Sequence, residues 1–421
     1  MTYDVVVCGA GPAGATCAYY LGLQGKKVAL LEKKTFPRDK LCGDAVATRA
    51  QSHLRAMGVL DEIVGEKQGN WARVGGLVTP TGKKYIGDST KASHNSEPLI
   101  IAIKRIVMDE KIARAAQKAG AELIENTQVV HLERTGGEWT VQCDRAGERV
   151  SHRAKVVVIA DGALSRLATA LGIVKDGPDG ICSRSYIQAG THNVDADGVM
   201  IYTSRLMPGY AALFKEANGE VNYCCYIIPG GRCSLEDLHE MHHSLLEAHP
   251  YVKEQVGPRA VMEKMRGAPL RLGGIPKSFA DGLLIVGDAA GHIDPLTGEG
   301  IHHAMDGAHQ AAITIGEAFA EGELGERMMK RYHDRWMKLF GRDFFWSKMM
   351  VKFYAKYPIF LDAYVNLAHK KGSEFLADWG KVMTGAEPKT YMLRPQLALP
   401  IAVETGRLWW ERTFRRGQPS A

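Results

Sequence analysis

Residues 4–14 read Asp-Val-Val-Val-Cys-Gly-Ala-Gly-Pro-Ala-Gly, and this stretch decides the fold. An apolar strand runs into the pattern Gly9-x-Gly11-x-x-Gly14, after which a helix is expected, and the next apolar strand ends in Glu32. In such a unit the first glycine permits a tight turn, the second lets a pyrophosphate approach the backbone, and the third lets helix and sheet pack closely. The layout predicts a dinucleotide-binding unit in which Glu32 accepts hydrogen bonds from ribose hydroxyls.

A distant segment narrows the choice of dinucleotide. Residues 284–300 read LIVGDAAGHIDPLTGEG, an apolar strand that ends at Asp288 and leads through a turn into a long predicted helix. In flavoproteins of the glutathione-reductase type, such a strand brings its Asp to the ribityl chain of FAD, and the helix N-terminus suits the flavin ring electrostatically. Residues 156–166, VVVIADGALSR, resemble the Asp-Gly segment of the same proteins. The chain is therefore predicted to bind FAD.

Length and composition limit the remaining possibilities. The chain has 421 residues and a net charge of +6, and no Lys/Arg run indicates a nucleic-acid groove. Its eight cysteines contain no CxxC pair, which favours a reducing compartment. The chain starts with a predicted strand and has no apolar run of membrane-spanning length, so we expect it in the cytoplasm or peripherally on a membrane.

The spacing of the motifs predicts an α/β fold in which a Rossmann-like FAD-binding domain is discontinuous. That domain is expected to comprise residues 1–80, 101–175 and 268–325, with a helix over 105–118. A β-rich substrate domain is expected at 81–100 and 176–267, with strands at 183–189, 199–203, 210–214 and 221–228. A helical C-terminal region is expected at 326–421.

The loop Phe36-Pro37-Arg38-Asp39-Lys40-Leu41-Cys42-Gly43-Asp44, taken with the segments above, resembles the geranylgeranyl reductase family of flavoproteins. The resemblance runs from residue 1 to about residue 385. The family loop often ends Cys-Gly-Gly, whereas Asp44 stands here. The family's GYxWLFP-like strand is GYAALFK at residues 209–215 and lacks the tryptophan and the proline.

The resemblance implies reduction of C=C bonds in an isoprenoid chain by proton delivery and flavin hydride transfer. Cys42 and Asp44 are the candidates for proton delivery, and Tyr210 is a candidate pocket residue. Cys42 could instead shape the loop as a small apolar residue, and Asp44 could cap a helix. Glu299 is expected to hold the turn at the flavin rather than to move protons.

The expected FAD contacts come from all the motifs and the elements between them. They are Gly9, Gly11, Pro12, Ala13, Gly14, Glu32, Lys33, Arg38, Cys42, Gly43, Asp44, Ala45, Arg105, Val129, Asp161, Gly162, Asp288, Pro295, Gly298, Gly300 and Ile301. Arg105 could instead be a solvated charge at the start of its helix. No metal site is expected. His302 and His303 are interpreted as helix packing, and His239 and His243 as a solvated face.

The partners and the reaction class leave alternatives open. The electron donor is expected to be NADPH or reduced ferredoxin, and the substrate a small-molecule or lipid isoprenoid. The amphipathic segment from Arg407 to Arg416 is consistent with docking on a membrane or with packing on the body. The alternative functions are a flavin monooxygenase acting on a lipidic or aromatic metabolite and a flavin-bound electron-transfer protein.

Overall fold

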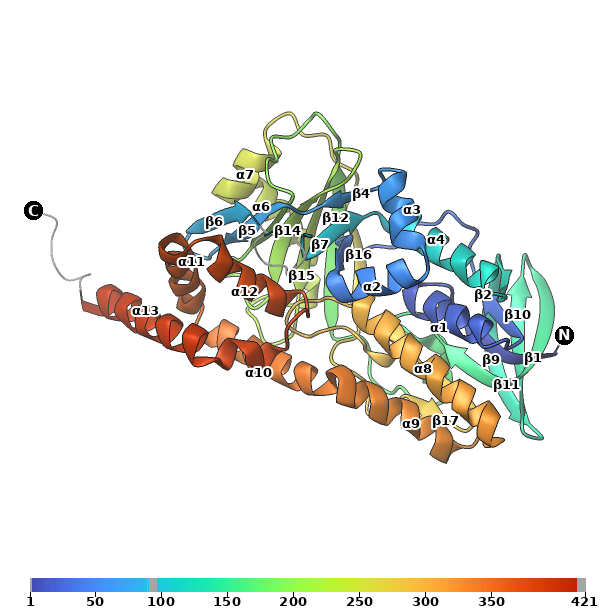
Figure 1. Cartoon of the computed structure of the whole chain (residues 1–421). Coiled ribbons are helices and arrows are strands. Elements are labelled where there is room, and N and C mark those ends of the chain that lie inside the picture. Colours follow the sequence, from blue (N-terminus) through green and yellow to red (C-terminus); the bar gives the residue numbers. More distant parts are fainter. Residues whose placement is uncertain (1, 89, 91–96, 415–421) are drawn as a thin grey trace, which may run out of the picture.

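The structure, a computed structural model, describes residues 2–88, 90 and 97–414 (Figure 1). Two large sheets lie side by side, and a row of helices runs along the lower edge of the molecule. The N-terminus lies at the end formed by the first sheet, and the last helix projects at the opposite end. The architecture is the expected α/β fold with a helical C-terminal region.

The first sheet is built around parallel strands from distant parts of the chain. Its strands, in spatial order, are β17 (Phe279–Ala280), β18 (Leu283–Ile285), β11 (Glu148–Ile159), β1 (Thr2–Cys8), β2 (Val28–Leu31) and β8 (Glu122–Ile124), with β10 (Glu138–Arg145) on β11 and β9 (Thr127–Thr135) on β10. β1 pairs in parallel with β11 and β2, as the dinucleotide motif predicted.

Both faces of this sheet are buried, which explains the unbroken apolar run of β1. Val5 and Val7 face one apolar cluster and Val6 and Cys8 face another, because successive side chains point to opposite faces. The first face packs against the helices α1 (Pro12–Leu23), α4 (Arg105–Lys118) and α8 (Ile301–Glu321). The second face packs against the β9–β10 ribbon and α5 (Arg166–Ala170).

The second sheet lies beside the first and contains the four strands predicted between residues 183 and 228. Its order is β16 (Arg266–Leu270), β12 (Gly180–Ile187), β15 (Val221–Ile227), β14 (Tyr210–Lys215), β13 (Gly198–Ile201), β5 (Val74–Val78) and β6 (Lys84–Asp88). Helices α6 (Leu238–Ala248), preceded by the turn η2 (Leu235–Asp237), and α7 (Pro250–Val256) cover one face.

One expected domain boundary, between residues 80 and 81, falls inside this sheet. Residues 74–78 were placed with the FAD domain, yet they pair in parallel with β13, and residues 84–88 pair with them in turn. This pairing joins segments more than 100 residues apart and leaves no local signal. A small third sheet, β3 (Ala45–Ala47), β7 (Ile100–Ile103) and β4 (Gly69–Trp71), adjoins α2 (Thr48–Ala56) and α3 (Val59–Gly65).

The predicted helical region follows α8. It comprises α9 (Glu326–Trp336), the π-helical turn η4 (Met337–Gly341), α10 (Arg342–Lys356), α11 (Ile359–Lys371), α12 (Ser373–Met383), the short turn η5 (Lys389–Leu393) and α13 (Pro395–Phe414). Most of its large aromatic side chains are core residues, among them Trp336, Tyr354 and Tyr364. In the described part of the chain, no helix has the length and apolar character needed to cross a bilayer.

A buried ion pair joins the helical region to the turn that follows β18. The Lys389 side chain is 2% exposed, and its Nζ lies 3.1 Å from Asp294 Oδ2 and 3.2 Å from Asp343 Oδ2. Ser347 Oγ donates to Asp294 Oδ2 at 2.7 Å. Burial alone would raise the pKa of the Asp294 carboxyl, but Lys389, His303 and Ser347 outweigh it and hold that pKa at about 2.

Lys389→Ala should destabilise the protein strongly, because it leaves Asp294 ionised and buried without its main partner. Removing one member of a buried pair costs roughly 3–5 kcal/mol of unfolding free energy, which urea denaturation would measure. The matched control is Lys330→Ala, since Lys330 pairs with Asp334 on an exposed helix face. That change should cost less than about 0.5 kcal/mol, and equal losses in the two variants would contradict the role of Lys389.

Candidate active site

Two adjoining cavities form one long cleft at the carboxyl ends of β1, β2 and β11, where open α/β sheets bind their ligands. Four residues, Gly11, Lys40, Ala160 and Gly162, line both cavities and make them continuous. One cavity reaches back over β2 and β9. The other runs between the turn after β18, the strands β14 to β16 and the end of α12. The cleft therefore connects the dinucleotide motif with the second sheet.

The glycine motif leaves space only toward the cleft. A Cβ atom on Gly9, which has a φ of +116°, would lie 2.4 Å from the Ala160 carbonyl oxygen, and one on Gly14 would lie 1.8 Å from the Gly9 oxygen. A Cβ on Gly11 would meet no protein atom within 4 Å. The first and third glycines are thus required by packing. Gly11 instead keeps a cradle open, which fits a pyrophosphate at the N-terminus of α1.

Acidic and basic side chains line the cavity over β2. Glu32 is buried, and its Oε2 accepts from Ala10 N at 3.3 Å and from the Arg38 guanidinium at 3.0 Å. Arg38 also forms an ion pair of 2.7 Å with Asp109. Lys33, Val129, Asp161 and Gly162 line the same cavity. This donor and acceptor set suits the ribose and phosphates of an adenosine diphosphate.

The other cavity holds a buried charge, Arg105, and a half-buried one, Asp288, that keep their ordinary ionisation. Arg105 Nε lies 2.6 Å from Asp109 Oδ1, and although burial alone would lower its pKa, Asp109 and Cys42 raise it. Asp288 lies 2.7 Å from Lys40 Nζ. Burial acts to raise the pKa of the Asp288 carboxyl, but Lys40 lowers it below its usual value.

Most of the predicted cofactor residues line one of the two cavities. They are Gly9, Gly11, Pro12, Ala13, Glu32, Lys33, Arg38, Cys42, Gly43, Ala45, Arg105, Val129, Asp161, Gly162, Asp288, Gly298, Gly300 and Ile301. Gly14 packs against Gly9 instead, and the Pro295 carbonyl accepts a hydrogen bond from Tyr226 at 3.2 Å.

Asp44 does not line the cleft, although its neighbours Gly43 and Ala45 do. It adopts a φ of +60°, and its buried Oδ2 accepts from Tyr186 at 2.5 Å and from Asn222 at 2.8 Å. Burial raises the pKa of its carboxyl to about 6 against the opposing effect of these donors and of Arg184. Asn222 also donates to the Cys42 carbonyl at 3.0 Å. Asp44 therefore anchors the loop of residues 36–44 to the second sheet instead of facing the cleft.

The two other predicted catalytic residues line the cavity. Burial raises the pKa of the Cys42 thiol, and Arg105 offsets only part of this effect, so the thiol is protonated at neutral pH. Tyr210 donates its hydroxyl proton to the Thr297 carbonyl, and burial raises the pKa of Tyr210 well above its usual value. Its hydroxyl group fixes the turn before α8. Three further cysteines, Cys182, Cys224 and Cys225, line the same cavity.

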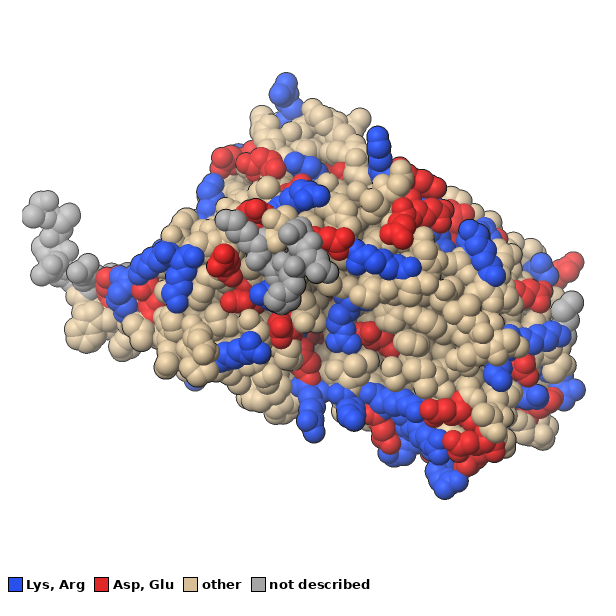
Figure 2. All heavy atoms as spheres, in the orientation of Figure 1, with Lys and Arg blue, Asp and Glu red and all other residues tan. Residues whose placement is uncertain are grey.

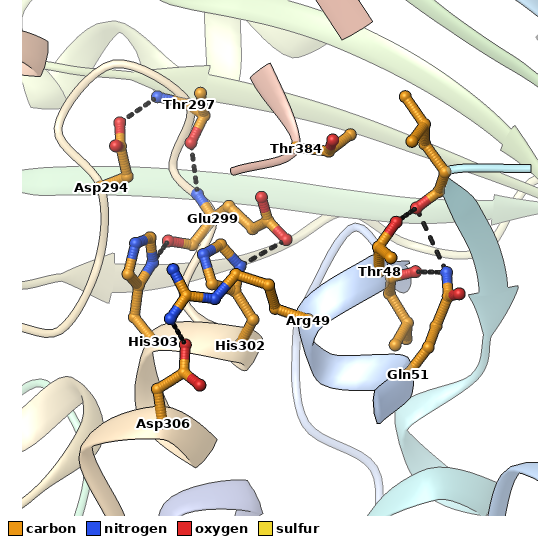
Figure 3. Close-up of polar contacts among 12 residues, drawn as sticks. Thr48, Arg49, Gln51, Asp294, Thr297, Glu299, His302, His303, Asp306 and Thr384 are labelled. Carbon is orange, nitrogen blue, oxygen red and sulfur yellow. Dashed lines mark hydrogen bonds and ion pairs between the residues drawn. The ribbon is translucent and has the colours of Figure 1, made fainter. Parts of the chain in front are cut away.

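Several polar side chains at the start of α8 form a cluster that the sequence did not predict (Figure 3). Glu299 lines the cavity, and its Oε1 lies 2.8 Å from His302 Nδ1. Arg49 on α2 forms an ion pair of 2.8 Å with Asp306, one turn further along α8. The motif GEG marked Glu299 in the sequence, but no local pattern places Arg49 beside it. Among the described residues, no cluster of His, Cys, Asp and Glu is arranged for a metal ion.

Comparisons with known proteins agree with this geometry. The sequence profile of the FAD binding domain matches residues 2–339. The chain is 48% identical over 423 residues to conditioned medium factor receptor 1 of Dictyostelium discoideum, with 98% of this chain and 82% of that protein covered. It is 32% identical over 340 residues to digeranylgeranylglycerophospholipid reductase of Methanocaldococcus jannaschii, with 79% of this chain and 82% of that protein covered.

Solved structures share the fold. A geranylgeranyl bacteriochlorophyll reductase-like protein from Thermoplasma acidophilum superposes with a TM-score of 0.78 at 23% identity, covering 94% of this chain and 98% of that one. A p-nitrophenol 4-monooxygenase from Pseudomonas putida has a TM-score of 0.69 at 17% identity, covering 91% and 98%. The matched domain identifies FAD as the cofactor, and the cradle at Gly11 fits the pyrophosphate of FAD.

Gly11→Ala should weaken FAD binding without unfolding the protein, because the added methyl group meets no protein atom and points into the cradle. We expect the dissociation constant to rise roughly 10- to 100-fold, about 1.4–2.8 kcal/mol, in fluorescence titrations with FAD. The melting temperature of the flavin-free protein should be unchanged. Gly65→Ala is the control, since Gly65 also has open space around it but lies on α3, outside the cleft. Unaltered FAD affinity in Gly11→Ala would contradict the cradle.

Proposed function

The chain belongs to the geranylgeranyl reductase family of FAD-dependent flavoproteins and is an FAD-dependent oxidoreductase, and on this basis we propose that it reduces C=C bonds of an isoprenoid chain. The supporting observation is the wall of the cavity beyond Arg105 and Asp288. Apolar side chains from several elements line it, namely Ala47, Ile100, Met200, Phe214, Leu270, Ile293 and Met383. Such a wall fits a hydrocarbon chain, whose transfer from water contributes about 25 cal/mol per Å² of buried apolar surface.

The residues of the cleft would serve this reaction in separate ways. FAD, when bound and reduced, supplies the hydride, while Gly11 and the N-terminus of α1 accommodate its phosphates and Arg105 gives the flavin end a fixed positive charge. The apolar wall excludes water from the double bond, because water there would compete with the substrate for the donated proton. An isolated double bond also needs a proton donor at one carbon. We expect NADPH or reduced ferredoxin to supply the electrons.

An anaerobic single-turnover experiment tests this function. Protein reduced with dithionite is mixed with geranylgeranyl diphosphate or a prenylated lipid, and flavin absorbance and product mass are followed. We expect flavin reoxidation without oxygen and a product that has gained two hydrogen atoms per turnover. Flavin that stays reduced until air is admitted, with a product that then gains one oxygen atom, would replace the proposal by the monooxygenase alternative. Flavin oxidation by a protein partner with no change in the isoprenoid would indicate electron transfer.

We also propose that the protein docks peripherally on anionic membranes through α10 and α13. Both helices lie along the lower edge of Figure 1, and their exposed side chains include Phe345, Trp346, Phe353, Leu399, Val403, Trp409, Trp410 and Phe414. Lysine and arginine side chains, with Asp and Glu among them, lie along the same lower edge in Figure 2. On η4 and α10 the exposed basic residues are Lys338, Arg342, Lys348, Lys352 and Lys356. Exposed aromatic residues beside basic ones are typical of helices that lie in a membrane interface.

Substituting both exposed tryptophans of α13, Trp409→Ala with Trp410→Ala, should abolish co-sedimentation with vesicles that contain phosphatidylserine. The two side chains are 58% and 59% exposed, so their loss should leave the melting temperature unchanged. Leu23→Ala is the control, because Leu23 is 62% exposed at the far end of the molecule on α1. Binding should also weaken with salt, since part of it is electrostatic. Undiminished sedimentation of the double variant would refute the docking surface.

A further inference from the structure

We infer that Glu299 donates the proton to the isoprenoid double bond, with His302 stabilising the carboxylate that remains. This assignment rests on the proposed reduction. Glu299 was expected from the sequence to hold the turn rather than to move protons, so the assignment shifts proton delivery from the loop before β3 to the start of α8.

The first argument compares the carboxyl groups that face the cavity. Among the described residues that line it, only Asp288 and Glu299 carry a carboxyl group. Asp288 is held as a carboxylate by Lys40 at 2.7 Å and has no proton to give. Asp44, the acid expected from the sequence, is turned away from the cleft. Glu299 is therefore the carboxyl group that can offer a proton inside the cavity.

The second argument is the position of the Glu299 side chain. Only 15% of it is exposed, and its Oε1 is occupied by His302 Nδ1 at 2.8 Å. In Figure 3 the other carboxyl oxygen points away from His302, on the side where Thr384 lies, and Thr384 also lines the cavity. No described residue forms a hydrogen bond to that oxygen. It is therefore free to hold a proton that faces the substrate.

The third argument is the charge around the pair. Burial raises the pKa of Glu299 well above its usual value, with Lys389 and Arg49 opposing this, so the protonated, neutral form of the carboxyl is favoured. Burial lowers the pKa of His302 to about 3, so its ring is neutral as well. A neutral His302 can donate from Nδ1 to the carboxylate once Glu299 has lost its proton. Asp306, which Arg49 and His53 contact at 2.8 and 3.0 Å, is already paired.

The other candidate donors are occupied or weaker. The Tyr210 hydroxyl already donates its proton to the Thr297 carbonyl, and the Cys42 thiol faces the cavity with a raised pKa, beside Arg105.

In the step we assign, the Glu299 O–H bond breaks and a C–H bond forms at one alkene carbon. Bound, reduced FAD would supply the hydride for the other carbon, and with it the two electrons that the reduction needs. The carboxylate then takes a proton from water when the product leaves.

Glu299→Gln tests the role directly, because it keeps the shape and the hydrogen bond to His302 but cannot donate an acidic proton. We expect anaerobic flavin reoxidation by the isoprenoid to slow by about 10²- to 10⁴-fold, the usual contribution of a general acid. FAD content and reduction by dithionite should be unchanged. Glu299→Asp, which retains a carboxyl group one methylene shorter, should recover part of the rate. In the parent protein the rate should fall as pH rises through the raised pKa of Glu299, and Glu299→Gln should lack this fall.

An infrared measurement on the flavin-free protein provides a readout independent of turnover. At pH 7 the parent should show a protonated-carboxyl stretch that Glu299→Gln reduces. Glu216→Gln is the matched control. Glu216 is a buried glutamic acid whose pKa burial also raises, but it does not line the cleft. It should lose infrared intensity while keeping the parent's reoxidation rate.

The outcomes separate this inference from the proposed function. A parent protein that never transfers its electrons to an isoprenoid overturns the proposed function and, with it, this role. A parent that turns over while Glu299→Gln keeps its rate and pH profile overturns the role of Glu299 alone. An unchanged protonated-carboxyl band in Glu299→Gln would do the same, since the residue would then be ionised.

Discussion

The turn from Asp294 to Gly300 depends on one buried ammonium group, that of Lys389. Asp294 accepts from the backbone N–H groups of Leu296 and Thr297 at 2.8 and 3.0 Å, so its position sets the path of the turn. This turn also positions Glu299 and the N-terminus of α8. A carboxylate this deeply buried remains ionised chiefly because Lys389 reaches it from a segment almost 100 residues later in the chain. The helical region is therefore part of the site and not an appendage to it.

The local motifs allowed much of this molecule to be predicted. The strand–glycine–helix unit, α4 and the strands between residues 183 and 228 were foreseen, because period and turn residues are encoded in neighbouring positions. Most of the residues predicted to contact the cofactor line the cleft for the same reason. What was missed depends on pairing between distant segments: residues 74–78 in the second sheet, Lys40 beside Asp288, and Arg49 beside Asp306.

Asp44 shows how a correct pattern can give a wrong placement. The related loop often has glycine where Asp44 stands, and the φ of +60° explains this, because glycine adopts the left-handed region without strain. Here the aspartate adopts that conformation with the help of Tyr186 and Asn222. With this positive φ, the Asp44 side chain contacts the second sheet and does not line the cleft. The acidic character of the residue suggested chemistry, whereas its backbone conformation decided its direction.

The four cysteines that line the cavity give its wall an unusual chemical character. Burial raises the pKa of Cys182 and Cys225 to about 12 each and raises those of Cys42 and Cys224 too. At neutral pH, a thiol with a pKa near 12 exists as thiolate in only about one molecule in 10⁵, and the thiolate is the form that attacks electrophiles. The sulfur atoms therefore present a soft, polarisable surface to whatever occupies the cavity, and those of Cys182 and Cys225 react only slowly with alkylating and oxidising agents. Sulfur can therefore pack in this wall like an apolar atom, because the low dielectric around a buried thiol disfavours the reactive thiolate.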